Sequence, residues 1–378
     1  MTVFLAMLLD AYRQLNSKKL FWVVLAISGI VVLFYGSIGF DDTGMSMFFG
    51  LTHIEDPMLT RDSFLSKLLY RSIFSTFILG LWLAWIATIL ALISTTAIFP
   101  DFLADGAIDI VLSKPVTRVK VFFFKYIASL LFVVLQVAIF CLGVFLCLGL
   151  RLSDWEWRIF AAIPLLTLFY SYLYSVNVLI GVWSRSTLTA LLVTLLFWFG
   201  IFSTNAAETI VNRIKTQMIM EVEGNDRDIA RMEVSLGGLQ SNQVPADSPA
   251  RANLQRSLES TRSDRDERQV LIDKIERWHK PVRVLQAIMP KTGETIGLLD
   301  RWLRRDTDIN IMDILDGAVA VDESGRYRRT QGDEDREIER RLESEAETRS
   351  DWYIIGTSLA FEAVVLLLGC SIFVKRDY

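Results

Sequence analysis

The chain has 378 residues, of which 52% are hydrophobic, and its mean hydropathy is +0.37. This composition excludes an ordinary soluble domain and indicates a membrane protein. The formal net charge of −4 gives no reason to expect a nucleic-acid partner. Three cysteines inside apolar runs and only two histidines argue against a disulfide framework and a multi-histidine metal site, so no metal is expected.

Residues 1–19 predict an amphipathic helix that lies in the membrane interface. Apolar residues recur on one helical face, and Asp10, Arg13 and Gln14 fall on the opposite face. The alternative is that this segment begins a longer first span.

Six apolar runs are long enough to cross a bilayer as helices, which requires about 20 residues each. They predict an all-α polytopic membrane protein, and a polar segment at 205–351 separates the last two runs. The runs cover residues 20–40, 73–99, 121–150, 159–183, 187–204 and 352–374.

Lysine and arginine in the short loops predict the orientation of the spans. If the spans alternate, most of these residues fall on one side, so both termini are expected to be cytoplasmic and the chain to lie in the cell inner membrane. Arg61, Lys67 and Arg71 in the first outer loop run against this bias. The residues that support it are Arg13, Lys18, Lys19, Lys114, Arg118, Lys120, Arg185, Lys375 and Arg376.

The polar segment 205–351 is then outside the cytoplasm, and we expect it to be mainly helical. Helices are predicted at 205–240 and 250–278, joined by the breaker SNQVPADSPA. A thin apolar stripe with many charges favours a helical hairpin or a stalk paired with a partner, and a solvated charged helix is the alternative. The more apolar stretch 281–303 is expected along the outer membrane surface. A charged helix is expected to run without a break into the sixth span, whose short tail ends the chain at 352–378.

A short helix is predicted at about 100–112, between the second and third spans. Pro100 suits the first turn of a helix, and Asp101, Asp105 and Asp109 recur every four residues on one face. Phe102 adds apolar contact area. A helix across the ends of two spans can transmit force from a partner, whereas the alternative is an interfacial helix that only caps the bundle.

The order of these parts resembles the type-2 ABC transporter permeases, the membrane subunits of bacterial ATP-driven exporters. The resemblance covers roughly 1–204 and 352–378, and the long outer segment departs from it. The motifs that carry it are DGAIDIVLSKPVTR at 105–118, SRS at 184–186 and FVKRDY at 373–378.

The resemblance implies that residues 100–112 form a coupling helix that docks on a cytoplasmic ATPase subunit. It assigns that docking to Asp101, Phe102, Asp105 and Asp109. It also implies a dimer with a second permease copy or a paralogue, and ATP bound by the partner rather than by this chain.

The chain carries no motif for nucleotide hydrolysis or proteolysis. It lacks the G-x-x-x-x-G-K-[ST] phosphate loop, H-E-x-x-H and G-x-S-x-G. We therefore expect no enzymatic activity and no cofactor in this chain.

Polar side chains inside the spans are the remaining candidates. Glu362 falls near the middle of the sixth span, where a carboxylate is costly and should face the bundle interior. Asn177 and Gln136 are its expected hydrogen-bond partners. All three side chains allow a role in the transport path or a purely structural role between helices.

Two functions are compatible with these features. The first is a permease subunit that moves a substrate with energy from a separate ATPase. The second is a membrane-anchored scaffold or sensor whose outer segment binds an envelope protein.

Overall fold

The computed structural model describes residues 19–55, 60, 66, 70, 73–104, 117–152, 155–242, 244–245, 248–304, 337–338, 340–342, 344 and 349–376. The interfacial helix expected at 1–19 lies outside these residues, except for Lys19. The chain divides into two compact units. The first, here called the bundle, comprises Met1–Ile201, Pro290–Arg326 and Asp351–Tyr378, and the second, the hairpin, comprises Phe202–Met289 and Tyr327–Ser350.

Long apolar helices dominate the part of the chain that the structure describes. Five of them have the length and composition to cross a membrane: Gly80–Leu103, Arg118–Arg151, Trp157–Ser184, Thr187–Ser241 and Asp351–Lys375. The first predicted span appears as the shorter apolar helix α2 (Lys19–Gly36). The described part of the chain is therefore largely helical, as expected, and its long apolar helices are compatible with a membrane protein.

The remaining predicted spans correspond to four long helices and one composite segment. The long helices are α7 (Arg118–Leu152), α8 (Ala162–Ser184), α9 (Thr187–Ser241) and α14 (Asp351–Lys375), with the 3-10 turn η3 (Trp157–Ala161) before α8. The second span is built from the π-helix η2 (Phe74–Ala87) and α4 (Thr88–Thr95), and α5 (Ile98–Ala104) follows.

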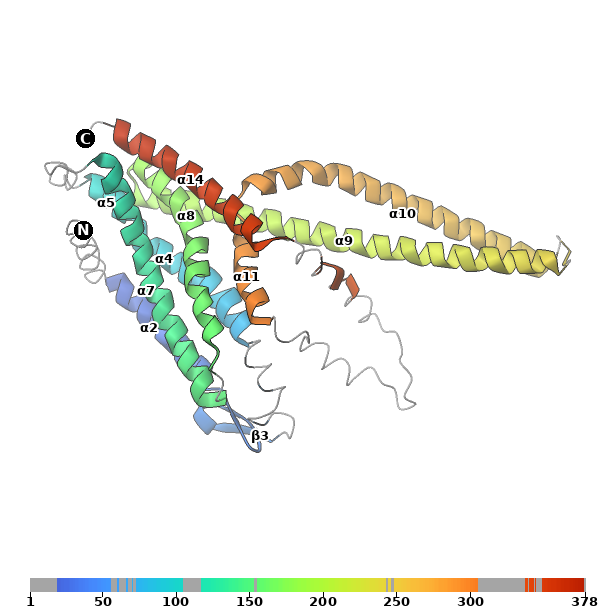
Figure 1. Ribbon diagram of the computed structural model, residues 1–378, viewed down its shortest axis with the longest axis horizontal. Coiled ribbons are helices and arrows are strands. Elements are labelled where there is room, and N and C mark those ends of the chain that lie inside the picture. The colour runs from blue at the N-terminus through green and yellow to red at the C-terminus, as the bar shows by residue number, and fades with distance from the viewer. Residues whose placement is uncertain are drawn as a thin grey trace. The chain divides into compact units, whose positions relative to one another are not determined.

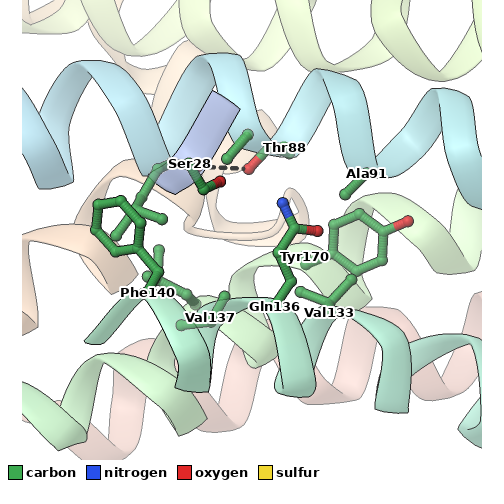
Figure 2. A pocket seen from close by; sticks show the side chains of 11 residues that line it. Ser28, Thr88, Ala91, Val133, Gln136, Val137, Phe140 and Tyr170 are labelled. Atoms are coloured by element: carbon green, nitrogen blue, oxygen red, sulfur yellow. Dashed lines mark hydrogen bonds between the residues drawn. The ribbon is translucent and has the colours of Figure 1, made fainter. Parts of the chain in front are cut away.

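Helix α8 is the centre of the bundle (Figure 1) and packs against α5, α7, α14 and a further helix, α11 (Thr292–Arg304). Three of its tyrosines, Tyr170, Tyr172 and Tyr174, are almost completely buried. A small cavity remains between α2, α4, α7 and α8 (Figure 2). By contrast, the apolar part of α9 is the least enclosed of the spans, as Leu196 at 70% exposure illustrates.

A small antiparallel sheet follows α2, which the sequence analysis does not predict. Its strands are β1 (Gly39–Asp41), β2 (Gly44–Met47) and β3 (Thr52–Glu55), in the order β1-β2-β3, and the 3-10 turn η1 (Phe48–Gly50) joins the last two. Arg151 near the end of α7 donates from Nε to the Gly36 carbonyl at 2.9 Å. The sheet therefore lies at the end of the bundle opposite α5, since α7 begins beside α5.

Helix α11 (Thr292–Arg304) belongs to the bundle, which corrects the expectation that 281–303 lies along the outer membrane surface. Leu298 and Leu299 are at most 1% exposed, and α11 packs against α8 and α14. Trp302 donates from Nε1 to Asp351 at 3.0 Å. The apolar face of α11 is therefore buried against neighbouring helices rather than against lipid headgroups.

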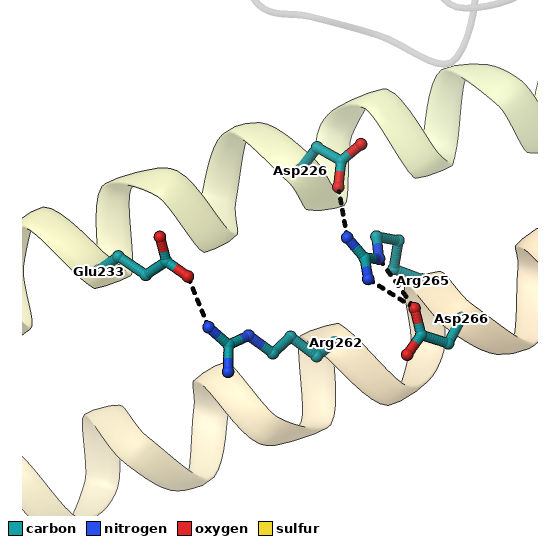
Figure 3. Close-up of polar contacts among 5 residues, drawn as sticks. All are labelled: Asp226, Glu233, Arg262, Arg265 and Asp266. Atoms are coloured by element: carbon teal, nitrogen blue, oxygen red, sulfur yellow. Dashed lines mark hydrogen bonds and ion pairs between the residues drawn. The ribbon is translucent and has the colours of Figure 1, made fainter.

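In the hairpin, the second part of α9 and α10 (Pro249–Ile288) run side by side (Figure 1), as the pattern at 205–278 predicts. Among the described residues of the hairpin, few apolar side chains are buried. The contacts between α9 and α10 include several ion pairs. Figure 3 shows two of these, Arg262–Glu233 at 2.5 Å and Arg265–Asp226 at 3.3 Å. Two more join Lys215 to Glu276 and Arg268 to Glu221.

Two boundaries of the outer segment differ from those expected. Helix α10 continues through Pro281 to Ile288, where the sequence predicts a break. A proline inside a helix removes one hydrogen bond and crowds the preceding turn. Gln286, beyond it, nevertheless bonds to Glu208 of α9, which holds this part of α10 against α9. The sixth-span helix begins at Asp351, and residues 349–350 are not helical, so it is not continuous with the charged helix before it.

A further contact in the hairpin joins Glu223 of α9 to Arg341 in two hydrogen bonds of 3.0 Å. The hydrogen bond from Arg341 lowers the pKa of Glu223 below its usual value. Because the folded pKa is the lower one, the pair stabilises this contact above the pKa of an unfolded glutamate. The contribution is lost as the pH falls through the lowered pKa.

We predict that Arg262→Glu increases hydrogen exchange in α10 and that Glu233→Arg in the same chain restores protection. Exposed ion pairs contribute about 0.2–1 kcal/mol each, so the coupling should be small and should shrink in 1 M salt. Arg256→Glu is the control, because Arg256 bonds within α10 to Asn253. If the effects of Arg262→Glu and Glu233→Arg on hydrogen exchange simply add, the ion pair between the two helices does not stabilise the hairpin.

Candidate functional site

Helix α5 places Asp101 and Phe102 in different environments. Asp101 is exposed, whereas Phe102 is 5% exposed and has the Lys125 ammonium 4.7 Å from its ring centroid. The side chain of Phe102 therefore anchors α5 to the bundle and does not face outward. Asp105 and Asp109 lie outside the described residues.

Two arginines bind the helix ends next to α5. Arg118 donates to the carbonyls of Val374 and Arg376 at 3.1 and 2.9 Å. Arg376 in turn donates to the carbonyls of Val182 and Trp183 at 2.7 and 3.0 Å. The last carbonyls of a helix lack partners within it, and a cation there also complements the helix dipole. We call Arg118 and Arg376 the arginine clasp; it joins the ends of α8 and α14 to the start of α7.

Glu362 is buried in the middle of α14, as expected, but its partners differ from those expected. Tyr126 of α7 donates to Oε1, and Ser171 of α8 donates to Oε2, both at 2.7 Å. Neither Asn177 nor Gln136 bonds to it, because both face other helices. One carboxylate thus joins three helices that are far apart in sequence.

The two hydrogen bonds of Glu362 reduce the energetic cost of a carboxylate inside a span. An ionised side chain at the centre of a span costs about 2.5–3.5 kcal/mol on insertion scales. Hydrogen bonds between membrane helices contribute about 0.6 kcal/mol on average and at most about 1.7. Two average bonds would contribute about 1.2 kcal/mol and two of the strongest about 3.4 kcal/mol, so the bonds from Tyr126 and Ser171 offset between a third and nearly all of that cost.

Asn177 forms a second polar junction on α8. Its Nδ2 donates to the Thr96 hydroxyl at 3.1 Å and to the Thr194 hydroxyl of α9 at 3.3 Å. Asn177 is 2% exposed and Thr194 is fully buried. This arrangement agrees with the structural role that the sequence analysis considered.

Gln136 of α7 points into the small cavity (Figure 2). It is 5% exposed, and its Oε1 has no hydrogen-bond partner among the described residues. Ser28, Thr88 and Tyr170 supply the other polar groups of the wall. About 20 Å³ is open to the centre of a water-sized sphere, which is room for one water molecule and not for a larger substrate.

The sequence analysis missed the residues that complete these sites. Tyr126 and Ser171 look like ordinary packing residues of apolar helices, and Arg118 and Arg376 read only as headgroup contacts. The density of tyrosine and serine in SYLYS at 171–175 is a usable signal, because buried hydroxyls in a span require partners.

We predict that Glu362→Leu keeps or raises the stability of the detergent-purified protein, whereas Tyr126→Phe lowers it by about 1–3 kcal/mol. Without Glu362, the Tyr126 hydroxyl can direct its one hydrogen to the Ser171 carbonyl, 3.0 Å away, and the Ser171 hydroxyl can direct its hydrogen to the Leu168 carbonyl, 2.8 Å away. Without the Tyr126 hydroxyl, the buried Oε1 of Glu362 has lost its donor. Thermal unfolding in one detergent measures both variants.

The double variant Glu362→Leu with Tyr126→Phe is the control and should regain most of the stability lost in Tyr126→Phe. If Glu362 had a purely structural role, Glu362→Leu would be less stable than Tyr126→Phe.

Among the described residues, no group of three or more His, Cys, Asp or Glu side chains is arranged to hold a metal ion. No protein-family model, curated protein or solved structure matches the chain. The resemblance to type-2 ABC transporter permeases therefore rests on the sequence motifs at 105–118, 184–186 and 373–378.

Proposed function

We propose that the chain is the permease subunit of an ATP-binding cassette transporter. In this proposal six spans cross the cell inner membrane with both termini in the cytoplasm. A separate ATPase subunit docks on residues 100–112 and supplies the energy for export.

The observation that carries the proposal is the seating of α5 on the ends of the bundle helices. Phe102 is buried, Pro100 packs against Gly181 of α8, and Asp101 remains exposed. Nearby, the arginine clasp joins the ends of α8 and α14 to the start of α7. Force applied at the exposed Asp101 would therefore reach several spans at once, because these helix ends are held together.

A second copy of the chain, or a paralogue, completes the proposed transporter. The apolar part of α9 exposes Leu188, Leu192 and Leu196 by more than half each. Such a surface suits lipid or another membrane helix, so it is compatible with a dimer.

The coupling role is tested by co-purification. We predict that membranes of cells that express the tagged chain yield a phosphate-loop ATPase with it. Reversing two charges in Asp105→Arg with Asp109→Arg should reduce the recovered ATPase at least about tenfold, because like charges across an interface cost several kcal/mol. The matched control reverses Asp41 and Asp42, which are exposed at the sheet end.

Sidedness supplies an independent check on the same proposal. In a chain without its native cysteines, Ala104→Cys should react with an impermeant maleimide only after the cells are permeabilised, and Asp42→Cys should react in intact cells. Labelling of Ala104→Cys in intact cells, or no ATPase with the unaltered chain, would reject the coupling helix.

The scaffold or sensor function remains the second candidate, favoured by the long ion-paired hairpin. Deletion of 222–267, the part of the hairpin beyond the Arg268–Glu221 ion pair, leaves α11 in the bundle and separates the two candidates in the same preparation. A permease should retain its ATPase partner after the deletion, whereas a scaffold should lose an envelope partner and never yield an ATPase.

A further inference from the structure

The chain enters the bundle at Pro290, Lys291 and Thr292, all of which are buried. The Lys291 amide donates to the hydroxyl of Ser358 in α14 at 2.9 Å. The Lys291 carbonyl accepts from both the amide and the hydroxyl of Thr295, at 2.9 and 2.8 Å. The backbone of Lys291 is therefore held on both sides, and its position is a built feature of the fold.

The side chain of Lys291 has no ion pair or hydrogen bond in the described part of the chain. The residue is 8% exposed, and the Nζ atom is buried without a hydrogen-bond partner. Its one contact of note is with the ring of Tyr353, whose centroid lies 4.6 Å from Nζ. A cation–π contact is weaker than the cost of burying an unpaired ammonium, so the site is incomplete without an anion.

The local backbone adds to the positive potential at this position. Lys291 directly precedes α11, a helix of 13 residues, and a helix N-terminus carries a partial positive charge, which the Glu294 carboxylate in its first turn offsets in part. The Thr292 hydroxyl lies in the first turn of α11, whereas the Ser358 hydroxyl already donates to the Ile354 carbonyl at 2.9 Å. An ammonium, a helix N-terminus and hydroxyl groups together are the usual donors for a phosphate.

The position along α14 indicates which anion is available. Ser358 lies seven residues after Asp351, about 10 Å along the helix at the usual rise. Trp352 is 84% exposed and Tyr353 is half exposed, and such aromatic residues favour the boundary between headgroups and hydrocarbon. The Tyr353 ring, which lies 4.6 Å from the ammonium, is itself half exposed.

We propose that Lys291 and the N-terminus of α11 form a binding site for the phosphate of a membrane phospholipid. The lipid comes from the leaflet at the sheet end, and its phosphate pairs with the Lys291 ammonium. The inference needs only that α14 spans the membrane, and it stands whether or not an ATPase binds at α5.

The test uses the full chain, delipidated in detergent and titrated with two lipids. One is phosphatidylglycerol and the other is a diacyl glycolipid without phosphate. Phosphatidylglycerol should raise the unfolding temperature and remain bound in native mass spectra, and the glycolipid should do neither. Equal effects of the two lipids on the unaltered chain would overturn the proposal.

Substitution locates the site. Lys291→Met should weaken phosphatidylglycerol binding about tenfold or more, as expected for the loss of one hydrogen bond to a charged group. Lys291→Arg should retain binding, and Lys274→Met is the control at an exposed lysine of α10. Unchanged binding in Lys291→Met would reject the site. Saturation of the unaltered chain by inorganic phosphate at the same concentration would reject a lipid as the ligand.

Discussion

Polar side chains along the central helix α8 need hydrogen-bond partners inside an apolar bundle, and this requirement orders the rest of the fold. Each partner comes from a different neighbouring helix. Ser171 meets Glu362 of α14, Tyr170 meets Thr95 of α4 at 2.5 Å, and Asn177 bonds to the hydroxyl of Thr194 in α9. Apolar packing between helices has no direction, whereas these bonds fix the rotation and register of each helix around α8.

The two ends of the bundle have different constructions. At one end, the arginine clasp closes the carboxyl ends of α8 and α14, and α5 lies beside it with one exposed carboxylate. The other end carries a small sheet, the exposed aromatic residue Trp352 and the buried Lys291. A protein that receives force from the cytoplasm and contacts lipid on the far side would need this asymmetry, and the proposed functions of the two ends are independent of one another.

The hairpin follows another principle, since its two helices bury little apolar surface. Cross-helix pairs such as Arg262–Glu233 have side chains that are about half exposed. Each pair contributes little and is weakened by salt, so the hairpin is held by many small terms along its length. The two helices of the hairpin should therefore separate more easily than the helices of the bundle. This property suits a flexible binding segment more than a rigid lever.

The sequence by itself determined where the long helices lie and which carboxylate would be buried. The sequence features that predict the helices are local properties of the chain. They are the apolar runs of span length, the breaker around Pro245 and the many charges beyond it. The central position of Glu362 in a span likewise follows from counting residues.

Only the tertiary structure decided which side chains meet. Tyr126 lies 236 residues from Glu362, and Arg118 lies 256 residues from Val374. The burial of α11, the passage of α10 through Pro281, the sheet after α2 and the unpaired Lys291 depend on such neighbours. A local pattern reports how hydrophobic a face is, but not which surface will cover it, because that depends on the simultaneous packing of every helix around α8.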